Sequence, residues 1–121
     1  MTKHNDNEEN EQYLISKDEV KDRTGYVQMV NAHALHEHLQ LQQDFDTWFN
    51  NHVEKLGLKE GMHFVFTKQE GKRSKICSKS EIDPNATNSH HFKIYAAKDI
   101  LEAEPHRNQV VILKQILSPY W

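Results

Sequence analysis

Apolar residues recur between positions 44 and 57 at the spacing of one helix face. Their separations of three, one, four and three residues match an amphipathic helix. The residues of this stripe are Phe45, Trp48, Phe49, Val53 and Leu56. Asp44 precedes them as a favoured N-cap, and Gly57 follows them as a favoured C-terminal residue. The pattern predicts a helix over residues 45–56 with an aromatic face in the core, one edge of which could instead anchor a partner protein.

A shorter apolar pattern comes before this helix. Leu35 and Leu39 are four residues apart and therefore share a helix face. Asn31 is a favoured N-cap, because its side-chain oxygen can accept a backbone N–H of the first turn. We expect a helix over about residues 32–40. Only a few residues join it to the aromatic helix, so the two form a tight helical pair.

Runs with strand character lie on both sides of the helical pair. YVQMV (26–30) alternates, and the short apolar run YLIS (13–16) can form a hairpin with it through the turn DRTG (22–25). After the helices, MHFVF (62–66) and HFKIY (91–95) also resemble strands. About 25 residues rich in Lys, Ser and Asn separate these two, which predicts a hairpin with an unusually long loop.

The C-terminal part has helical character. AAKDILEA (96–103) is one segment, and Pro105 can occupy the first turn of a second helix that contains the apolar run QVVILKQIL (109–117). The elements together predict an α+β fold. We expect a small single domain over residues 13–121, with a helix pair, a β-hairpin with a long loop, and C-terminal helices.

Composition changes this picture at the N-terminus. Apolar residues make up 36% of the 121-residue chain, below the usual 45–50% of globular domains. Residues 1–12 contain a single apolar residue, Met1, which predicts a disordered acidic tail. Residues 1–24 hold four Lys or Arg against seven Asp or Glu, which accounts for the whole net charge of −3. The remaining residues 25–121 are neutral, so no global bias towards nucleic acid or an anionic membrane is expected.

Cysteine usage and hydropathy indicate the compartment. Cys77 is the single cysteine, which excludes an intrachain disulfide and fits a reducing cytoplasm. No apolar run approaches the roughly 18 residues of a membrane span, and no signal peptide is recognisable. We therefore expect a cytoplasmic protein that does not act at a membrane.

The histidines do not have the spacing of a metal site. On a helix, His33 and His36 lie about 60° apart in projection, but His38 lies about 140° from His33, so the three cannot converge on one ion. His90 and His91 precede a strand, where neighbouring side chains point to opposite faces. We expect these histidines to be structural or solvated, and we expect no metal.

Catalytic patterns are missing as well. The chain has four glycines, no glycine-rich phosphate loop, and no serine in a nucleophile elbow. Its carboxylates are scattered over expected polar faces. We therefore expect no catalytic residues, no cofactor and no enzymatic activity.

The segment TKQEGKRSKICSKSEI (67–82) is the main charged feature. Its basic residues outnumber its two glutamates, Glu70 and Glu81. The basic residues are Lys68, Lys72, Arg73, Lys75 and Lys79. Such a loop could follow a phosphate backbone as a wing, meet an acidic protein surface, or simply be solvated.

The order of motifs resembles the AntA/AntB antirepressor domain of bacteriophages. The resemblance rests on VNAHALHEHL, DFDTWF, GLKEGMHFVF and FKIYAAKDIL, and it covers roughly residues 28–104. The family pattern V-N-A-x-x-L-H-x-x-L, D-F-x-x-W, E-G-x-x-F and A-K-x-(I/L) is matched in that order. The matching residues are Val30, Asn31, Ala32, Leu35, His36, Leu39, Asp44, Phe45, Trp48, Glu60, Gly61, Phe64, Ala97, Lys98 and Ile100. His33 departs from the family, which usually has Arg at that position.

The resemblance implies a phage or prophage regulator. Such antirepressors antagonise a lysogeny repressor by protein binding and so favour lytic growth. The expected partner is a phage repressor or a host regulatory or defence protein. The resemblance leaves open whether the chain forms a homodimer. The related KilA-N and BRO-N domains include DNA binders, so the alternative is a DNA-binding transcriptional regulator that uses the loop 67–82 as a wing. The side chains that we expect to contact the partner are His33, His38, Lys72, Arg73, Lys75 and Lys79.

Overall fold

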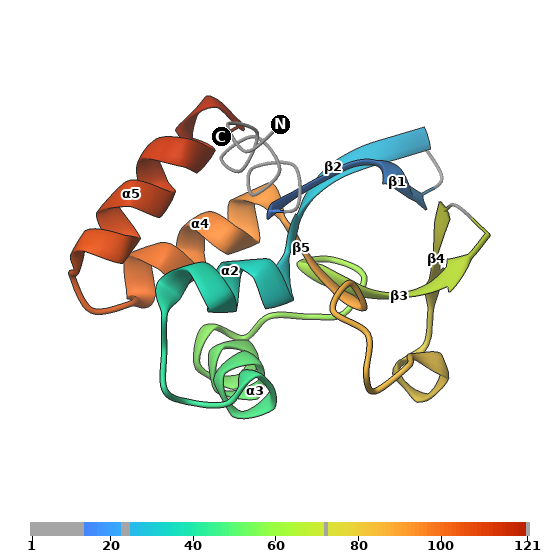
Figure 1. Cartoon of the computed structure of the whole chain (residues 1–121), viewed down its shortest axis with the longest axis horizontal. Coiled ribbons are helices and arrows are strands. Elements are labelled where there is room, and N and C mark those ends of the chain that lie inside the picture. The colour runs from blue at the N-terminus through green and yellow to red at the C-terminus, as the bar shows by residue number, and fades with distance from the viewer. Residues whose placement is uncertain (1–13, 23–24, 72, 121) are drawn as a thin grey trace, which may run out of the picture.

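The computed structural model describes residues 14–22, 25–71 and 73–120 (Figure 1). Within these ranges the chain forms five strands, four α-helices and two short 3₁₀ helices, η2 (Lys79–Glu81) and η3 (Ser118–Tyr120). The strands are β1 (Ile15–Asp22), β2 (Gly25–Asn31), β3 (Phe64–Glu70), β4 (Arg73–Cys77) and β5 (His90–Lys93). The helices are α2 (Ala32–Leu39), α3 (Phe45–Leu56), α4 (Ile94–Ala103) and α5 (Asn108–Leu117). The predicted α+β class is confirmed, whereas the predicted tail at 1–12 lies outside the described residues.

The strands are arranged in the order β1-β2-β5-β3-β4 and close into a small barrel. Neighbours are antiparallel, except that one parallel bridge between Val20 and Ser74 joins β1 to β4 and closes the barrel. The predicted hairpin of 13–16 with 26–30 is confirmed, with Ile15 opposite Val30. The closed barrel was not predicted from sequence.

The segment between the two later strands differs from the sequence prediction. The predicted strands at 62–66 and 91–95 do pair, with Phe64 opposite Phe92. The prediction of a long loop between them is wrong, however. Strand β3 continues to Glu70, and the chain turns at Gly71 (φ +65°) into β4. Hydrophobic patterning does not reveal β4, since Ser74 is its only described buried residue. The basic segment 67–82 is therefore mainly a β-hairpin.

The helix pair follows the sequence prediction closely. The side chain of Asn31 accepts the backbone N–H of Ala34 at 3.1 Å and caps α2. Asp44 caps α3 in the same way, accepting the N–H of Thr47 at 3.1 Å. Gly57 ends α3 with φ +66°, a left-handed conformation that glycine adopts without a Cβ clash. Both predicted helices and their caps are confirmed.

Two boundaries in the C-terminal part were predicted wrongly. Ile94 and Tyr95 begin α4 instead of ending a strand. Starting the helix at Ile94 brings Ala96 and Ala97 into the core, where both are fully buried. Pro105 lies in the connection before α5, which begins at Asn108, so it is not in the first turn of that helix. The helical character of 96–103 and 109–117 is confirmed.

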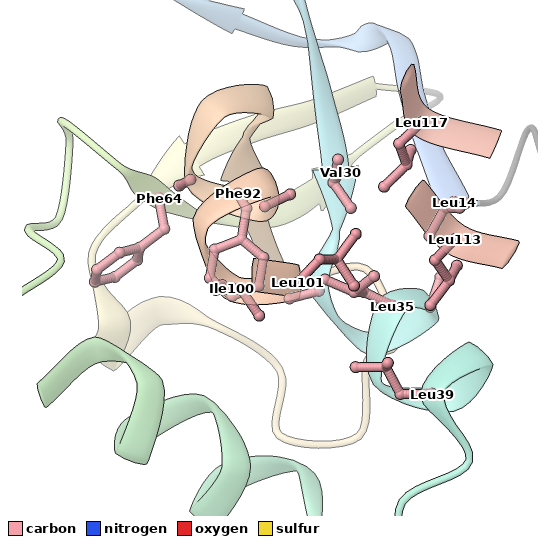
Figure 2. Close-up of a cluster of buried hydrophobic side chains, with 14 of the residues drawn as sticks. Leu14, Val30, Leu35, Leu39, Phe64, Phe92, Ile100, Leu101, Leu113 and Leu117 are labelled. Atoms are coloured by element: carbon pink, nitrogen blue, oxygen red, sulfur yellow. The ribbon is translucent and has the colours of Figure 1, made fainter. Parts of the chain in front are cut away.

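The main core lies where α2, α4 and α5 pack against β1, β2 and β5 (Figures 1 and 2). Several side chains at this junction are no more than 1% exposed. They include Leu14, Val30, Leu35, Leu39, Phe92, Ile100, Leu101, Leu113 and Leu117. Trp48 and Phe49 of α3 are 2% and 4% exposed, which confirms that the aromatic stripe belongs mainly to the core. The β3–β4 hairpin projects on the side away from α5 (Figure 1).

Candidate functional site

A groove with a volume of about 500 Å³ lies between α3 and the segment 79–90. One wall comes from α3, including Asp46 and Asn50. The other wall comes from η2 and the turn that follows it, including Lys79 and Asp83. We call this cavity the α3 groove. It is the candidate site because it brings residues from the helix pair beside residues from the basic segment.

Local hydrogen bonds shape the wall opposite α3. The backbone N–H of Ser78 donates to Glu81 Oε1 at 3.0 Å, which holds the start of η2 and positions Lys79. The Asp83 carboxylate accepts the N–H of Asn85 at 2.9 Å through Oδ1. That contact is an Asx turn, which fixes the direction of the chain. This wall is therefore a series of tight turns.

The floor of the α3 groove is an aromatic cluster centred on His90. Four rings meet the His90 imidazole edge to face, at centroid distances of 4.8–5.2 Å and interplanar angles of 83–87°. These rings belong to His33, Phe45, Phe49 and Phe66. Edge-to-face pairs are a favoured aromatic geometry. The floor is therefore apolar and tightly packed.

His33 is anchored within this cluster. Its ring stacks on Phe45, with centroids 3.7 Å apart and an interplanar angle of 15°. The Ser89 hydroxyl lies 2.7 Å from His90 Nδ1 and 3.5 Å from His33 Nε2, so it links the two imidazoles. His33 is half-buried and lines the groove, and only part of its side chain is available to a partner.

Burial makes the imidazoles of this region poor proton acceptors. Desolvation lowers the pKa of His90 to about 3. Desolvation also lowers the pKa of His33 to about 4, although the nearby Asp46 carboxylate partly opposes the shift. Both rings are neutral at pH 7. The charge of the α3 groove therefore comes from its rim, where Asp46, Asp83 and Lys79 lie.

The structure brings together two of the residues expected to contact a partner. His33 and Lys79 both line the α3 groove. His38 is half-exposed on α2 and does not line it. Lys75 is exposed on β4. Arg73 begins β4, and Lys72 lies outside the described residues.

The lysines of the hairpin are partly neutralised by its glutamates. Lys68 Nζ lies 3.3 Å from Glu81 Oε2, and Lys75 Nζ lies 3.9 Å from Glu70 Oε2. Lys79 makes no ion pair within the described part of the chain. Among the described side chains of the basic segment, Lys68 and Lys75 are therefore paired with glutamates, whereas Lys79 is not.

A polar cluster on another face of α3 was not predicted from the sequence. Trp48 Nε1 donates to Glu104 Oε2 at 2.8 Å, and His52 Nε2 lies 2.7 Å from the same oxygen. Arg107 Nη2 lies 3.7 Å from Glu104 Oε1, while its Nη1 donates to the carbonyl of Leu39 at 3.1 Å. No sequence signal marks Glu104, because its partners are 52 and 56 residues away along the chain.

Electrostatics keeps Glu104 ionised. Burial disfavours the ionised form of Glu104, because its side chain is 5% exposed. The hydrogen bonds from His52 and Trp48 and the positive charge of Arg107 together outweigh this effect of burial. The pKa of Glu104 therefore lies below its usual range. A second cavity, of about 440 Å³, adjoins this cluster and is lined by His52, Glu104 and Pro105 among others. The Glu104 carboxylate beside this cavity already joins α3 to the C-terminal helices through its hydrogen bonds and ion pair.

The described residues contain neither a metal-binding cluster nor a membrane-spanning helix. No three or more His, Cys, Asp or Glu side chains among them gather in a way that could hold a metal ion. No helix in the same ranges has the length and apolar character needed to cross a bilayer.

Comparison with protein families matches residues 30–101 to the AntA/AntB antirepressor family, which is more than half of the 121 residues. No curated protein and no solved structure gave a match. The matched range contains the helix pair, the barrel strands from Val30 onward and most of α4. All of the α3 groove residues named above fall within it. The chain therefore belongs to the AntA/AntB antirepressor family, whose members are antirepressor-type regulators with a regulatory protein as partner.

Proposed function

We propose that this protein is a phage or prophage antirepressor that inactivates a repressor-type protein by binding it stoichiometrically through the α3 groove. The observation that carries this proposal is the shared position of His33 and Lys79 on one groove of about 500 Å³. A concave site with an apolar floor and a few polar groups at its rim can receive side chains of a partner. The neighbouring hairpin lysines provide charges at the edge of such an interface.

Charge pairing favours a protein partner over DNA. A duplex requires several cations that can neutralise phosphates. Lys68 and Lys75 already have glutamate partners. Asp46 and Asp83 on the groove rim would repel a phosphate backbone. A protein surface of mixed charge fits this arrangement better.

The shape of the β3–β4 hairpin supports the alternative of DNA binding with a wing. The basic segment projects from the barrel as two paired strands (Figure 1). Direct titration with a random-sequence duplex and with a duplex library distinguishes the two functions. We expect no binding below about 1 μM at physiological salt, where non-specific DNA binders have dissociation constants of roughly 1–100 μM. Sequence-selective submicromolar binding with a steep salt dependence would establish the DNA function instead.

The Ser89–His90 contact does not support catalysis. Its Oγ–Nδ1 distance of 2.7 Å is within the range of a nucleophile and its base. However, Ser89 is 2% exposed, so its hydroxyl is not accessible to a substrate. Burial also lowers the pKa of His90 to about 3, which makes the imidazole a weak base. The pair contributes to the floor of the groove.

The protein-binding function is tested with a variant that obstructs the α3 groove. Asn50 is exposed and lines the groove, so Asn50→Trp should place an indole across its mouth while α3 remains folded. Proteins captured from host lysate by wild type are identified, purified and titrated against both forms. We expect at least a tenfold loss of affinity with Asn50→Trp, and no loss with Lys98→Ala, which alters an exposed residue of α4 outside the groove. Equal binding by wild type and Asn50→Trp would place the partner surface elsewhere.

A further inference from the structure

The carboxylates at the rim of the α3 groove have no cation of their own. Asp46 and Asp83 make no ion pair with any Lys, Arg or His that the structure describes. They come from the two walls of the groove, one from α3 and one from the turn after η2. Lys79 is the single basic side chain among the lining residues that keeps a charge at pH 7. Two acids and one base give the rim a net negative charge.

The floor beneath these carboxylates consists of aromatic rings. Phe49 and Phe66 contact His90 edge to face at 4.8 and 5.0 Å, and His33 forms part of the same cluster. Aromatic faces attract cations through the ring quadrupole. Since burial keeps both imidazoles neutral, the floor adds no positive charge to oppose a cation.

We propose that the α3 groove binds an arginine side chain of the regulatory partner, with its guanidinium group paired to Asp46 and Asp83 above the aromatic floor. This inference rests on the proposed function, in which the groove is the partner-binding surface. A guanidinium group fits better than an ammonium group. It is planar, stacks on aromatic rings and donates in a fork to carboxylate oxygens.

Other occupants fit these walls less well. An anionic side chain would meet two carboxylates and one lysine, so its net interaction with the rim would be repulsive. A purely apolar side chain would exclude water from Asp46 and Asp83 without replacing the lost hydrogen bonds. An arginine satisfies both carboxylates and covers the floor with its methylene groups.

Direct binding of a blocked arginine tests the site without knowledge of the partner. The full chain is titrated with N-acetyl-arginine-N-methylamide, and backbone amide shifts are followed by NMR. We expect saturable shifts at residues 45–50 and 79–90. The matched neutral probe is the citrulline analogue, which keeps the shape but has no charge, and it should bind roughly tenfold more weakly. Equal binding of the two probes, or shifts confined to other surfaces, would overturn the inference.

Variants separate this inference from the proposed function. Asp46→Asn with Asp83→Asn keeps the size of the rim side chains and removes both charges, and it should abolish the arginine shifts and weaken partner binding. Asp99→Asn with Glu102→Gln removes two charges from exposed residues of α4 and should change neither. If Asn50→Trp prevents partner binding but the double asparagine variant binds normally, the arginine inference fails and the groove remains the partner surface. If neither variant affects the partner, the proposed site fails as well.

Discussion

Two faces of helix α3 carry similar residue types in opposite arrangements. On one face, Trp48 and His52 share the buried Glu104 carboxylate, which also lies beside Arg107. On another face, Asp46 lines the α3 groove above neutral imidazoles and makes no ion pair with a residue that the structure describes. The first face has its acid paired inside the molecule, and the second presents its acid to the solvent.

This difference separates stability from recognition. A buried carboxylate is tolerated only when hydrogen bonds and opposite charge replace its hydration, so the Glu104 cluster fixes the position of α3 relative to α4 and α5. A carboxylate at the rim remains hydrated, and its interaction energy is available to a ligand. We therefore expect substitutions in the Glu104 cluster to affect folding and substitutions at the groove to affect binding.

Removing Trp48 should have the largest effect, because this residue belongs to both the core and the Glu104 cluster. Trp48→Ala should lower the free energy of unfolding by ~3–5 kcal/mol, as expected for truncation of a buried aromatic side chain. Denaturant titration followed by circular dichroism measures the loss. Trp48→Phe keeps an aromatic ring but removes part of the indole volume and the N–H that donates to Glu104, so it should cost less than Trp48→Ala. A Trp48→Ala protein as stable as wild type would show that the core does not depend on this side chain.

Acid should affect the buried histidines before it affects the Glu104 cluster. Burial lowers the pKa of His33 and His91 to about 4 and that of His90 to about 3. The unfolded chain binds these protons near pH 6.5, so stability is complete above that pH and decreases as the pH falls towards 4. His91, which is fully buried, should alone account for ~2 kcal/mol between pH 7 and pH 5. Glu104 has a lowered pKa, so its contribution is lost only when the pH falls below its ordinary value of 4.5.

Unfolding free energies at several pH values test this order. Wild type should lose stability from pH 6.5 downward, and His91→Gln should show a shallower dependence by about one proton. The quantity to compare is the change in unfolding free energy between pH 7 and pH 5. His91→Gln can also lower the unfolding free energy equally at both pH values, and that part cancels in the difference. A flat profile for wild type between pH 7 and pH 5 would mean that these imidazoles are not buried as the structure has them.

Neutralising Glu104 should have an intermediate effect. Glu104→Gln keeps the shape, and its amide oxygen can still accept from Trp48 and His52, but it removes the charge that balances Arg107 and turns an amide N–H₂ group towards that guanidinium. We expect a loss of about 1–3 kcal/mol, the usual cost of unpaired buried polar groups. Glu102→Gln, at an exposed position of the same helix, should leave thermal unfolding unchanged. Equal melting temperatures for the two variants would mean that α3 is not held in place by this cluster.

Local patterns in the sequence were sufficient for the helix pair. The caps Asn31 and Asp44, the terminator Gly57 and the apolar spacing of α3 act within a few residues, so their effect is readable without the fold. Strand β4 was missed because its contacts are mainly backbone hydrogen bonds to β3, and Ser74 is its only described buried side chain. Hydrophobic alternation does not reveal a strand in which none of the described apolar side chains is fully buried.

The candidate site was only partly predictable for a related reason. His33 and Lys79 were predicted as contact residues from their residue types. That both line one groove depends on the barrel, which places segment 79–90 beside α3. The burial that makes His33 and His90 neutral is likewise a tertiary effect. Glu104 gave no signal at all, because a glutamate just after a helix is normally solvated.

The smallest effect on stability is expected at the hairpin. Lys75 is 61% exposed and lies 3.9 Å from Glu70, so Lys75→Ala should change the free energy of unfolding by less than about 1 kcal/mol. Its effect should appear in binding kinetics, because charges at the rim of an interface act mainly on the association rate. Surface plasmon resonance with the identified partner, at low and at physiological salt, would measure this. We expect slower association at low salt, an unchanged dissociation rate, and convergence with wild type as salt increases. A large change in dissociation rate would instead place Lys75 at the centre of the interface and make the hairpin, not the α3 groove, the main contact surface.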